Sequence, residues 1–411
     1  MSRSTSDPAG PIPPDATAVV VGGSLAGLRA AQGLRKGGFS GRLVLVGAEA
    51  HLPYERPPLS KQVLAGTWEP DRATLSDQGA LDDLGIEARL GHRAVSLDVA
   101  GRRVELDDGS FLLGDGVVVA TGATPRSLFA EEGVLVLRTI DDCRALRERV
   151  LAAGEGCALV VIGAGFIGAE VASTCSGLGC TVTVIETLPV PLAPALGETV
   201  GGALGALHGR HGVDLRTETS VAALGAGADG AASIELTDGA TLEADVVVAG
   251  IGVVPEVSWL EGSGLTLDNG VVCDAGLFAA DGVVAAGDLA RWPFSGGLVR
   301  IEHFQMAADM GAAAASALLA GRAAAPAFVP VPYFWSDQYG EKIQVLGRPL
   351  PDDEVVVVDG TLEGRFVALY RRGDALSGAA AVSRPRQLMS YRALLAAGAS
   401  FDEGLAASDP G

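Results

Sequence analysis

One pattern occurs twice in this chain and limits what it can fold into: a short apolar strand, a glycine-rich turn, a helix, a second strand and then a carboxylate. The two copies occupy residues 18–49 and 159–186. Strand, glycine turn and helix in this order form the βαβ unit that binds dinucleotides. A single glycine turn would be weak evidence, but two complete units predict an α/β protein with two Rossmann-like domains.

Each position of the glycine turn has a physical task. The first glycine permits the tight turn, the second position must be small so that the backbone approaches a pyrophosphate, and the third lets helix and strand pack closely. The helix N-terminus then offers free N–H groups to the phosphates. Ser24 fills the middle position of the first copy, where a small residue is tolerated. The candidate turn residues are Gly22, Ser24, Leu25, Ala26 and Gly27 in the first copy, and Gly163, Gly165, Phe166, Ile167 and Gly168 in the second.

A carboxylate ends each unit, Glu49 in the first and Glu186 in the second. Such a group accepts hydrogen bonds from a ribose diol and repels a 2′-phosphate. No arginine follows Glu186 in residues 187–189. The second unit is therefore predicted to prefer NADH over NADPH.

Composition excludes other classes of protein. A formal net charge of −20 repels nucleic acid and anionic membrane surfaces. The chain also contains no uninterrupted run of about 20 apolar residues, the length that a membrane-spanning helix needs. The five cysteines are an odd number, which argues against a disulfide scaffold and for reduced thiols, so we expect a cytoplasmic protein. No metal-ligand spacing appears, and 411 residues should form two or three domains.

Beyond the two units, the sequence predicts hairpins, a linker and a small C-terminal domain. Asp-Gly turns at 108–109 and 238–239 separate short apolar strands. An Ala-rich helix is expected at about 304–319 and a linker at 326–332. The alternating strands and the helix at about 385–396 that follow indicate an α+β domain.

Longer runs in the chain resemble a known family. Pro-Pro-Leu-Ser-Lys at 57–61 and Tyr-Phe-Trp-Ser-Asp-Gln at 333–338 are more specific than the glycine turns, and Ala-Thr-Gly at 120–122 and Ala-Gly-Asp at 286–288 follow in the family's order. From about residue 15 to 400, the chain resembles FAD-dependent NADH:ferredoxin reductases of the putidaredoxin reductase and biphenyl dioxygenase reductase type. The resemblance implies that FAD binds the first glycine turn and NADH the second.

The same resemblance implies how the chain divides. The expected parts are a disordered tail at 1–14, an FAD domain at 15–124 and 245–326, an inserted NAD domain at 125–244, and an α+β domain at 327–411 that covers the flavin. Ala48 departs from the family, which often has an acid there, so which carboxylate holds the adenosine ribose stays open. The other residues implied to bind FAD are Glu49, Arg56, Lys61, Ala94, Thr121, Gly122, Arg138, Gly287, Asp288 and Phe304, and those implied to bind NAD are Glu170, Glu186 and Gly252.

Three side chains are candidates for a role in hydride transfer from nicotinamide to flavin. Lys61, in a chain with only three lysines, suits a cation near flavin N5, or it is an exposed loop lysine. Glu170 could bind the nicotinamide carboxamide, or it could simply favour the helix N-terminus. Trp335 could lie against a cofactor ring, or it could pack the C-terminal domain.

The cysteines argue against disulfide and peroxide reductases, which need a thiol against the flavin. No cysteine precedes Cys143. Cys175 and Cys180 lie in the second unit and are interpreted as small buried hydrophobic residues. Electrons must then leave the flavin directly, to a one-electron acceptor.

The resemblance implies that this acceptor is a 2Fe–2S ferredoxin that serves a cytochrome P450 or a ring-hydroxylating oxygenase. Because both proteins would be acidic, transient docking requires a local basic patch. The alternatives are a reductase of rubredoxin or of a small acceptor, and a redox-sensing flavoprotein of the apoptosis-inducing-factor type. Candidates for the patch are Arg291, Arg300, Lys342, Arg384 and Arg386.

Overall fold

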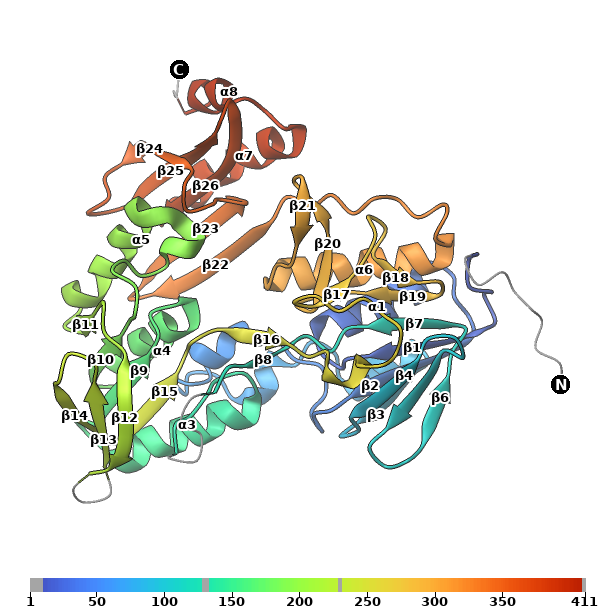
Figure 1. The fold of residues 1–411 in the computed structure, drawn as a ribbon, viewed down its shortest axis with the longest axis horizontal. Helices are drawn as coiled ribbons and strands as arrows, with labels where there is room; N and C mark the ends of the chain where they lie inside the picture. Colours follow the sequence, from blue (N-terminus) through green and yellow to red (C-terminus); the bar gives the residue numbers. More distant parts are fainter. Residues whose placement is uncertain (1–9, 128–132, 228–230, 409–411) are drawn as a thin grey trace. The chain divides into compact units, whose positions relative to one another are not determined.

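The computed structural model describes residues 10–127, 133–227 and 231–408, and the chain forms two compact units (Figure 1). Unit 1 comprises Met1–Glu55, Ala73–Thr124 and Val254–Pro330, and unit 2 comprises Arg56–Arg72, Pro125–Val253 and Val331–Gly411. Among the described residues, no helix is long and apolar enough to cross a membrane.

Unit 1 is built on a six-stranded sheet that carries the first glycine turn. The strand β1 (Thr17–Val21) is buried from Ala18 to Val21, as expected for a strand covered on both faces. It pairs in parallel with β2 (Arg42–Gly47) and β7 (Gly116–Val119), so the first predicted βαβ unit is confirmed. The strand order is β18 (Phe278–Ala280), β19 (Val283–Ala285), β7 (Gly116–Val119), β1 (Thr17–Val21), β2 (Arg42–Gly47) and β3 (Ile86–Leu90).

Two helices of unit 1, α1 (Leu25–Lys36) and α6 (Phe304–Ala320), pack against each other through small residues. A Cβ atom on Gly33 would lie 2.9 Å from the Cβ of Ala315, and one on Gly311 would lie 2.2 Å from the carbonyl oxygen of Ala26. Ile12 is buried and donates its backbone N–H to Leu318 at 3.1 Å. The prediction of a disordered tail is therefore wrong at Ile12, and residues 1–9 lie outside the described part.

Smaller elements complete unit 1. The sheet of β4, β5 and β6 contains the first predicted hairpin, which is confirmed. Trp292 on β20 is fully buried. These elements are β4 (Ala94–Asp98), β5 (Arg103–Leu106), β6 (Phe111–Leu113), β17 (Val271–Val272), β20 (Ala290–Phe294), β21 (Gly297–Val299) and α2 (Gln78–Asp83). In addition, β8 (Ala123–Pro125) pairs with β16 (Val253–Pro255).

Unit 2 contains a four-stranded parallel sheet that carries the second glycine turn. Its order is β11 (Asp214–Arg216), β10 (Thr181–Ile185), β9 (Ala158–Ile162) and β15 (Val246–Ala249). Because β15 pairs with β9, residues 246–249 belong to this sheet, and the expected boundary at 245 is too early. The remaining elements are α3 (Ile140–Ala153), α4 (Phe166–Gly177), and the hairpin strands β12 (Val221–Ala226), β13 (Ala232–Leu236) and β14 (Thr241–Ala244).

The C-terminal part of unit 2 is a five-stranded antiparallel sheet with helices on both faces (Figure 1). One face packs on α5 (Ala193–Arg210), where the Tyr370 hydroxyl donates to the Leu196 carbonyl at 2.9 Å. The other face packs on α7 (Pro385–Ala397) and α8 (Phe401–Ala406). The strand order is β22 (Tyr333–Gln338), β23 (Glu341–Gly347), β26 (Ala375–Val382), β25 (Phe366–Arg372) and β24 (Glu354–Gly360).

The packing of α1 on α6 predicts a steric test. Gly311→Ala should lower the free energy of unfolding by about 1–3 kcal/mol, because the new methyl group meets a backbone oxygen. A methyl group on Gly202 of α5 would have no atom within 4 Å, so Gly202→Ala should be neutral or stabilising by up to about 1 kcal/mol. Urea unfolding followed by circular dichroism measures the free energy of unfolding of both variants. Equal values for Gly311→Ala and Gly202→Ala would contradict the close packing of α1 on α6.

Candidate functional site

In the glycine turn of unit 1, backbone segments lie so close together that only glycine fits. A Cβ atom on Gly27 would lie 1.9 Å from the carbonyl oxygen of Gly22, and one on Gly22 would lie 2.0 Å from the carbonyl oxygen of Ala120. Gly22 also has a φ of 130°, which favours glycine. Strand, turn and helix are therefore held together by direct backbone contact.

Unit 2 repeats the same geometry. A Cβ atom on Gly168 would lie 2.0 Å from the carbonyl oxygen of Gly163, and one on Gly163 would lie 2.6 Å from that of Gly250. At Gly165 the nearest atom would be 3.7 Å away, so the middle of the turn has room. Each helix also begins without a side-chain cap, at Ser24 for α1 and at Gly165 for α4.

These two turns fit dinucleotide phosphates. Helix N-termini that no side chain caps leave backbone N–H groups for an anion, and the glycines let that anion approach the backbone. Phe166 and Ile167 open α4, and the side chain of Ile167 is exposed. Leu25 and Ala26 open α1 and are buried.

Of the other predicted FAD residues of unit 1, Gly287 lies close to the first glycine turn. A Cβ atom on Gly287 would lie 3.0 Å from the Cβ of Ala26, so the Ala-Gly-Asp segment that includes Asp288 reaches this turn. Phe304 is the first residue of α6, and Ala94 is buried at the start of β4. The carboxylate of Glu49 accepts a hydrogen bond from Tyr54.

Thr121 lies after β7, beside Gly122. Its hydroxyl donates to the carbonyl of Glu256 at 2.7 Å and accepts from the indole of Trp259 at 3.3 Å. These two hydrogen bonds hold Thr121 against the segment that contains Glu256 and Trp259. Gly122 has a φ of 73°, in the left-handed region.

Three residues that the sequence analysis assigned to FAD belong to unit 2: Arg56, Lys61 and Arg138. The Arg56 guanidinium donates to the carbonyl of Arg138 at 2.5 Å, and the N–H of Arg138 donates to Asp142 at 3.0 Å. This links the segment before the short 3₁₀ helix at Pro57–Ser60 to the start of α3.

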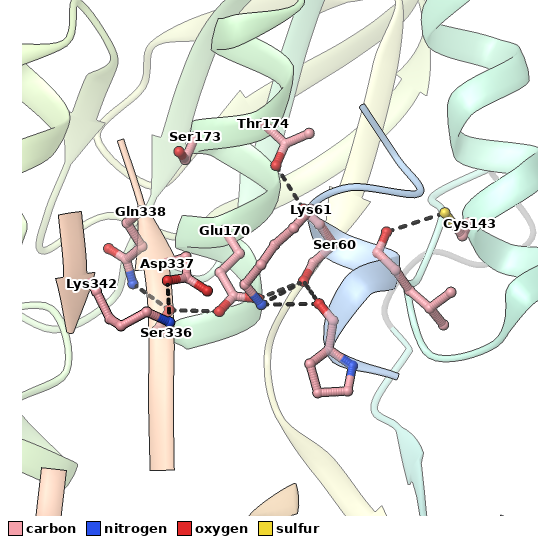
Figure 2. Close-up of polar contacts among 12 residues, drawn as sticks. Ser60, Lys61, Cys143, Glu170, Ser173, Thr174, Ser336, Asp337, Gln338 and Lys342 are labelled. Atoms are coloured by element: carbon pink, nitrogen blue, oxygen red, sulfur yellow. Dashed lines mark hydrogen bonds and ion pairs between the residues drawn. The ribbon is translucent and has the colours of Figure 1, made fainter. Parts of the chain in front are cut away.

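A buried carboxylate, Glu170, joins three separate segments of unit 2 (Figure 2). It accepts hydrogen bonds from the Lys61 ammonium at 2.6 Å, the Ser60 hydroxyl at 2.5 Å and the Ser336 hydroxyl at 2.6 Å. The side chains of Glu170 and Lys61 are 4% and 11% exposed. Lys61 also donates to the Pro57 carbonyl at 3.0 Å. Lys61 is therefore a largely buried, paired cation, and its interpretation as an exposed loop lysine is wrong.

The strand β22 presents its two neighbouring motif residues to opposite faces, because side chains alternate along a strand. Ser336 is fully buried and bonds Glu170, while Trp335 stacks on Tyr333 with ring centroids 6.0 Å apart. Phe334 makes an edge contact with Phe166, which opens α4, at 4.8 Å. The α4 N-terminus and β22 are thus packed together.

Sequence reasoning missed Ser60 and Ser336 as partners of Glu170. Both lie inside the specific motifs, directly before Lys61 and directly after Trp335. The sequence did offer one indication: in each motif, a serine is the direct neighbour of a candidate site residue. Their convergence on one carboxylate appears only in the fold.

We call the glycine turns at Gly22–Gly27 and Gly163–Gly168 the first and second cradle. In the second cradle, Glu186 accepts hydrogen bonds from the backbone N–H groups of Ala164, at 2.8 Å, and Leu188, at 2.9 Å. The carboxylate therefore lies against the glycine turn of unit 2. Gly252, another predicted NAD residue, follows β15 with a φ of 92°.

Cys143, which contacts the 3₁₀ helix at Pro57–Ser60, is an inert thiol. Cys143 is buried on α3 and its thiol donates to the carbonyl of Leu59 at 3.1 Å. Burial raises the pKa of the Cys143 thiol to about 11, so it stays protonated near neutral pH.

Comparison with known proteins places the chain among flavoprotein reductases. Residues 16–311 match the family described as pyridine nucleotide-disulphide oxidoreductase, and residues 333–410 match the reductase C-terminal family. The chain is 38% identical to rhodocoxin reductase of Rhodococcus erythropolis, covering 92% of this chain and 89% of that protein. It is 39% identical to the ferredoxin–NAD(+) reductase component of the anthranilate 1,2-dioxygenase system of Burkholderia cepacia, covering 93% and 95%.

A solved structure shows the same architecture. The putidaredoxin reductase chain of a covalent complex with putidaredoxin superposes with a TM-score of 0.87 and 31% identity, covering 93% of each chain. The predicted fold class, with two nucleotide-binding folds and a C-terminal antiparallel sheet, is confirmed.

The pairing of Lys61 with Glu170 predicts non-additive losses of stability. Replacing one member of a buried ion pair leaves the other charge uncompensated, so Lys61→Met or Glu170→Met should each cost about 3–5 kcal/mol. The double variant should cost clearly less than the sum. Urea unfolding of the three variants measures the coupling.

The exposed pair Arg216–Asp214 provides the matched control, with side chains 31% and 53% exposed. Arg216→Met should cost only about 0–1 kcal/mol. Single losses at Lys61 and Glu170 no larger than this would show that the buried pair does not hold the segments together.

Proposed function

Because this chain belongs to the pyridine nucleotide-disulphide oxidoreductase family and resembles its ferredoxin reductases, we propose that it is an FAD-dependent NADH:ferredoxin reductase. The observation that carries the proposal is the doubled glycine cradle, with the same backbone contacts in both units. One cradle suits FAD and the other suits NADH. Bound FAD would accept two electrons as hydride from NADH and release them one at a time.

We assign the FAD cradle to the turn of Gly22–Gly27, braced by Gly287 and the start of α6 at Phe304. The NADH cradle is the turn of Gly163–Gly168, with Glu186 at its side. The contacts of Glu186 with backbone N–H groups support this assignment, because they hold its carboxylate at the turn. A carboxylate there accepts from a ribose diol and disfavours a 2′-phosphate.

Lys61, Glu170 and Trp335 are proposed to act on the cofactor rings. Glu170 orients the Lys61 ammonium through a 2.6 Å contact, and the two serine hydroxyls hold the carboxylate in turn. A fixed cation stabilises negative charge that develops on a reduced ring. The stacking of Trp335 on Tyr333 fixes the indole plane.

The proposed partner is a small 2Fe–2S ferredoxin that serves an oxygenase or a cytochrome P450. The basic residues considered for docking are mostly paired with carboxylates of their own unit: Arg300 with Glu302, Lys342 with Asp337, Arg384 with Asp359, and Arg291 with Asp268. Such pairs reduce the net positive charge offered to an acidic partner. Docking is therefore expected to be weak and transient, and sensitive to salt.

An anaerobic NADH titration of the purified flavoprotein tests both cofactor assignments. We expect flavin absorbance to bleach with about one equivalent of NADH, because one hydride reduces one flavin. Steady-state turnover with a 2Fe–2S ferredoxin, a rubredoxin and a quinone then separates the acceptors. Preferential ferredoxin reduction that slows as salt increases supports the proposal. Slow turnover with every acceptor would favour the redox-sensing alternative instead.

Glu186→Arg should shift coenzyme preference towards NADPH. The change removes a ribose acceptor and adds a guanidinium for a 2′-phosphate, so the ratio of kcat/KM for NADH to that for NADPH should fall by about tenfold or more, or roughly 1.4 kcal/mol. Glu155→Arg makes the same charge change at an exposed turn and should leave the ratio unchanged. A native protein that uses both coenzymes equally would remove the basis for this assignment.

A further inference from the structure

Three of the five cysteines meet at one end of the second βαβ unit: Cys175, Cys180 and Cys157. All are free thiols. The chain leaves α4 through Gly179, which has a φ of 90°. The N–H of Cys180 donates to the carbonyl of Cys175 at 3.0 Å, and that of Gly179 donates to Ser176 at 3.0 Å. This is the Schellman motif, which brings the side chains of Cys180 and Cys175 into contact.

The third cysteine reaches the same point through the sheet. Cys157 directly precedes β9, and Cys180 directly precedes β10. The strands pair in parallel, with Thr181 opposite Ala158, and the N–H of Thr181 donates to the carbonyl of Cys157 at 2.9 Å. Neighbouring strands lie about 4.8 Å apart, which is within the roughly 4.4–6.8 Å between Cα atoms of disulfides.

The three thiols differ in their environment. Cys175 and Cys157 are buried, whereas Cys180 is half-buried and follows the exposed residues Gly177, Leu178 and Gly179. Hydrogen bonds from the thiols of Cys175 and Cys157 lower the pKa of Cys180 to about 7, although burial and Asp245 oppose this. Burial raises the pKa of Cys157 to about 12. Cys180 is thus the thiol that ionises and that solvent can reach.

The arrangement does not fit a metal site. Within residues 10–127, 133–227 and 231–408, no group of three or more histidine, cysteine or acidic side chains could hold a metal ion. A thiolate held against two further thiols is instead the arrangement of an attacking cysteine with its resolving partners.

We propose that Cys180 is a peroxide-reactive thiol that closes an intramolecular disulfide with Cys175 or Cys157. Cys175 is buried, as the sequence analysis expected, whereas Cys180 is only half-buried. The cluster lies at the C-terminal end of α4, whereas the glycine turn of unit 2 lies at the N-terminal end of that helix. The inference does not depend on the proposed function.

The oxidation proceeds in two balanced steps. The Cys180 sulfur attacks one oxygen of hydrogen peroxide, so that an S–O bond forms, the O–O bond breaks and hydroxide leaves. Sulfur is oxidised to the sulfenic acid and peroxide is reduced. The second thiol then attacks this sulfur, an S–S bond forms, the S–O bond breaks, and the hydroxyl group leaves with the thiol proton as water.

The test is peptide mapping of the intact flavoprotein after brief exposure to hydrogen peroxide, with remaining thiols alkylated before digestion. After cleavage at acidic residues, Cys157 lies on one peptide, and Cys175 and Cys180 lie together on another. We therefore expect a disulfide of Cys180 either with Cys157, seen as a joined pair of peptides, or with Cys175, seen as a link within one peptide. Dithiothreitol should reduce either link. The mapping uses the native protein, so it stands even if a variant fails to fold. A matched measurement is the oxidation of Cys273, which is buried in unit 1 and lies outside the cluster.

Two sets of variants complete the design. Cys180→Ser should slow the loss of free thiols by about tenfold or more, because the ionised thiol is removed, while Cys273→Ser should not change it. In the double variant Cys157→Ser/Cys175→Ser, which lacks both resolving thiols, a sulfenic-acid trap such as dimedone should label Cys180. Oxidation of Cys180 no faster than that of Cys273, or disulfides formed only between chains, would overturn the proposal.

Discussion

The architecture depends on one steric constraint, the contact between a helix and the turn that starts it. In both units, the third glycine of the turn lies so close to the first that it has no room for a side chain. A Cβ atom would lie 1.9 Å from the carbonyl oxygen of Gly22 if added to Gly27, and 2.0 Å from that of Gly163 if added to Gly168. This closeness brings the helix N-terminus over the carboxyl end of the central strand, where ligands of α/β sheets bind. The polar surroundings of each cradle, including Glu186, are arranged around that fixed point.

Glu170, a buried charge on α4, shows how one carboxylate can hold two other segments of the chain in place. Its three donors come from the 3₁₀ helix and the residue after it, and from β22, which lie far from each other in sequence. Removing a carboxylate from water is costly unless its oxygens find donors. The folded chain must therefore bring the two specific motifs to α4 together, which links the geometry of the site to the stability of unit 2.

Local patterns were sufficient to predict both βαβ units, the hairpins, the Ala-rich helix and the position of Glu186, because period, turn residues and strand-end acids are encoded within short stretches. Pairings between segments far apart in the chain could not be predicted in this way. Nothing in residues 246–249 distinguishes a strand of the second sheet from one of the first, and the run 333–338 contains aromatic and polar residues without a clear alternation. The contact of Lys61 with Glu170 and the cysteine cluster likewise join residues through the fold, so each motif was identified but its neighbours were not.

The helix α5 has a consequence for how the protein is made. Its apolar side, with Leu196, Val200 and Leu204, is covered by strands that lie more than a hundred residues later in the chain. A ribosome adding about 5–20 residues per second leaves that surface bare for several seconds before the covering strands emerge. During this interval the nascent polypeptide exposes the apolar side of α5 to the cell, so chaperones should bind translation intermediates there. For the same reason, truncation of the C-terminal strands should yield insoluble fragments.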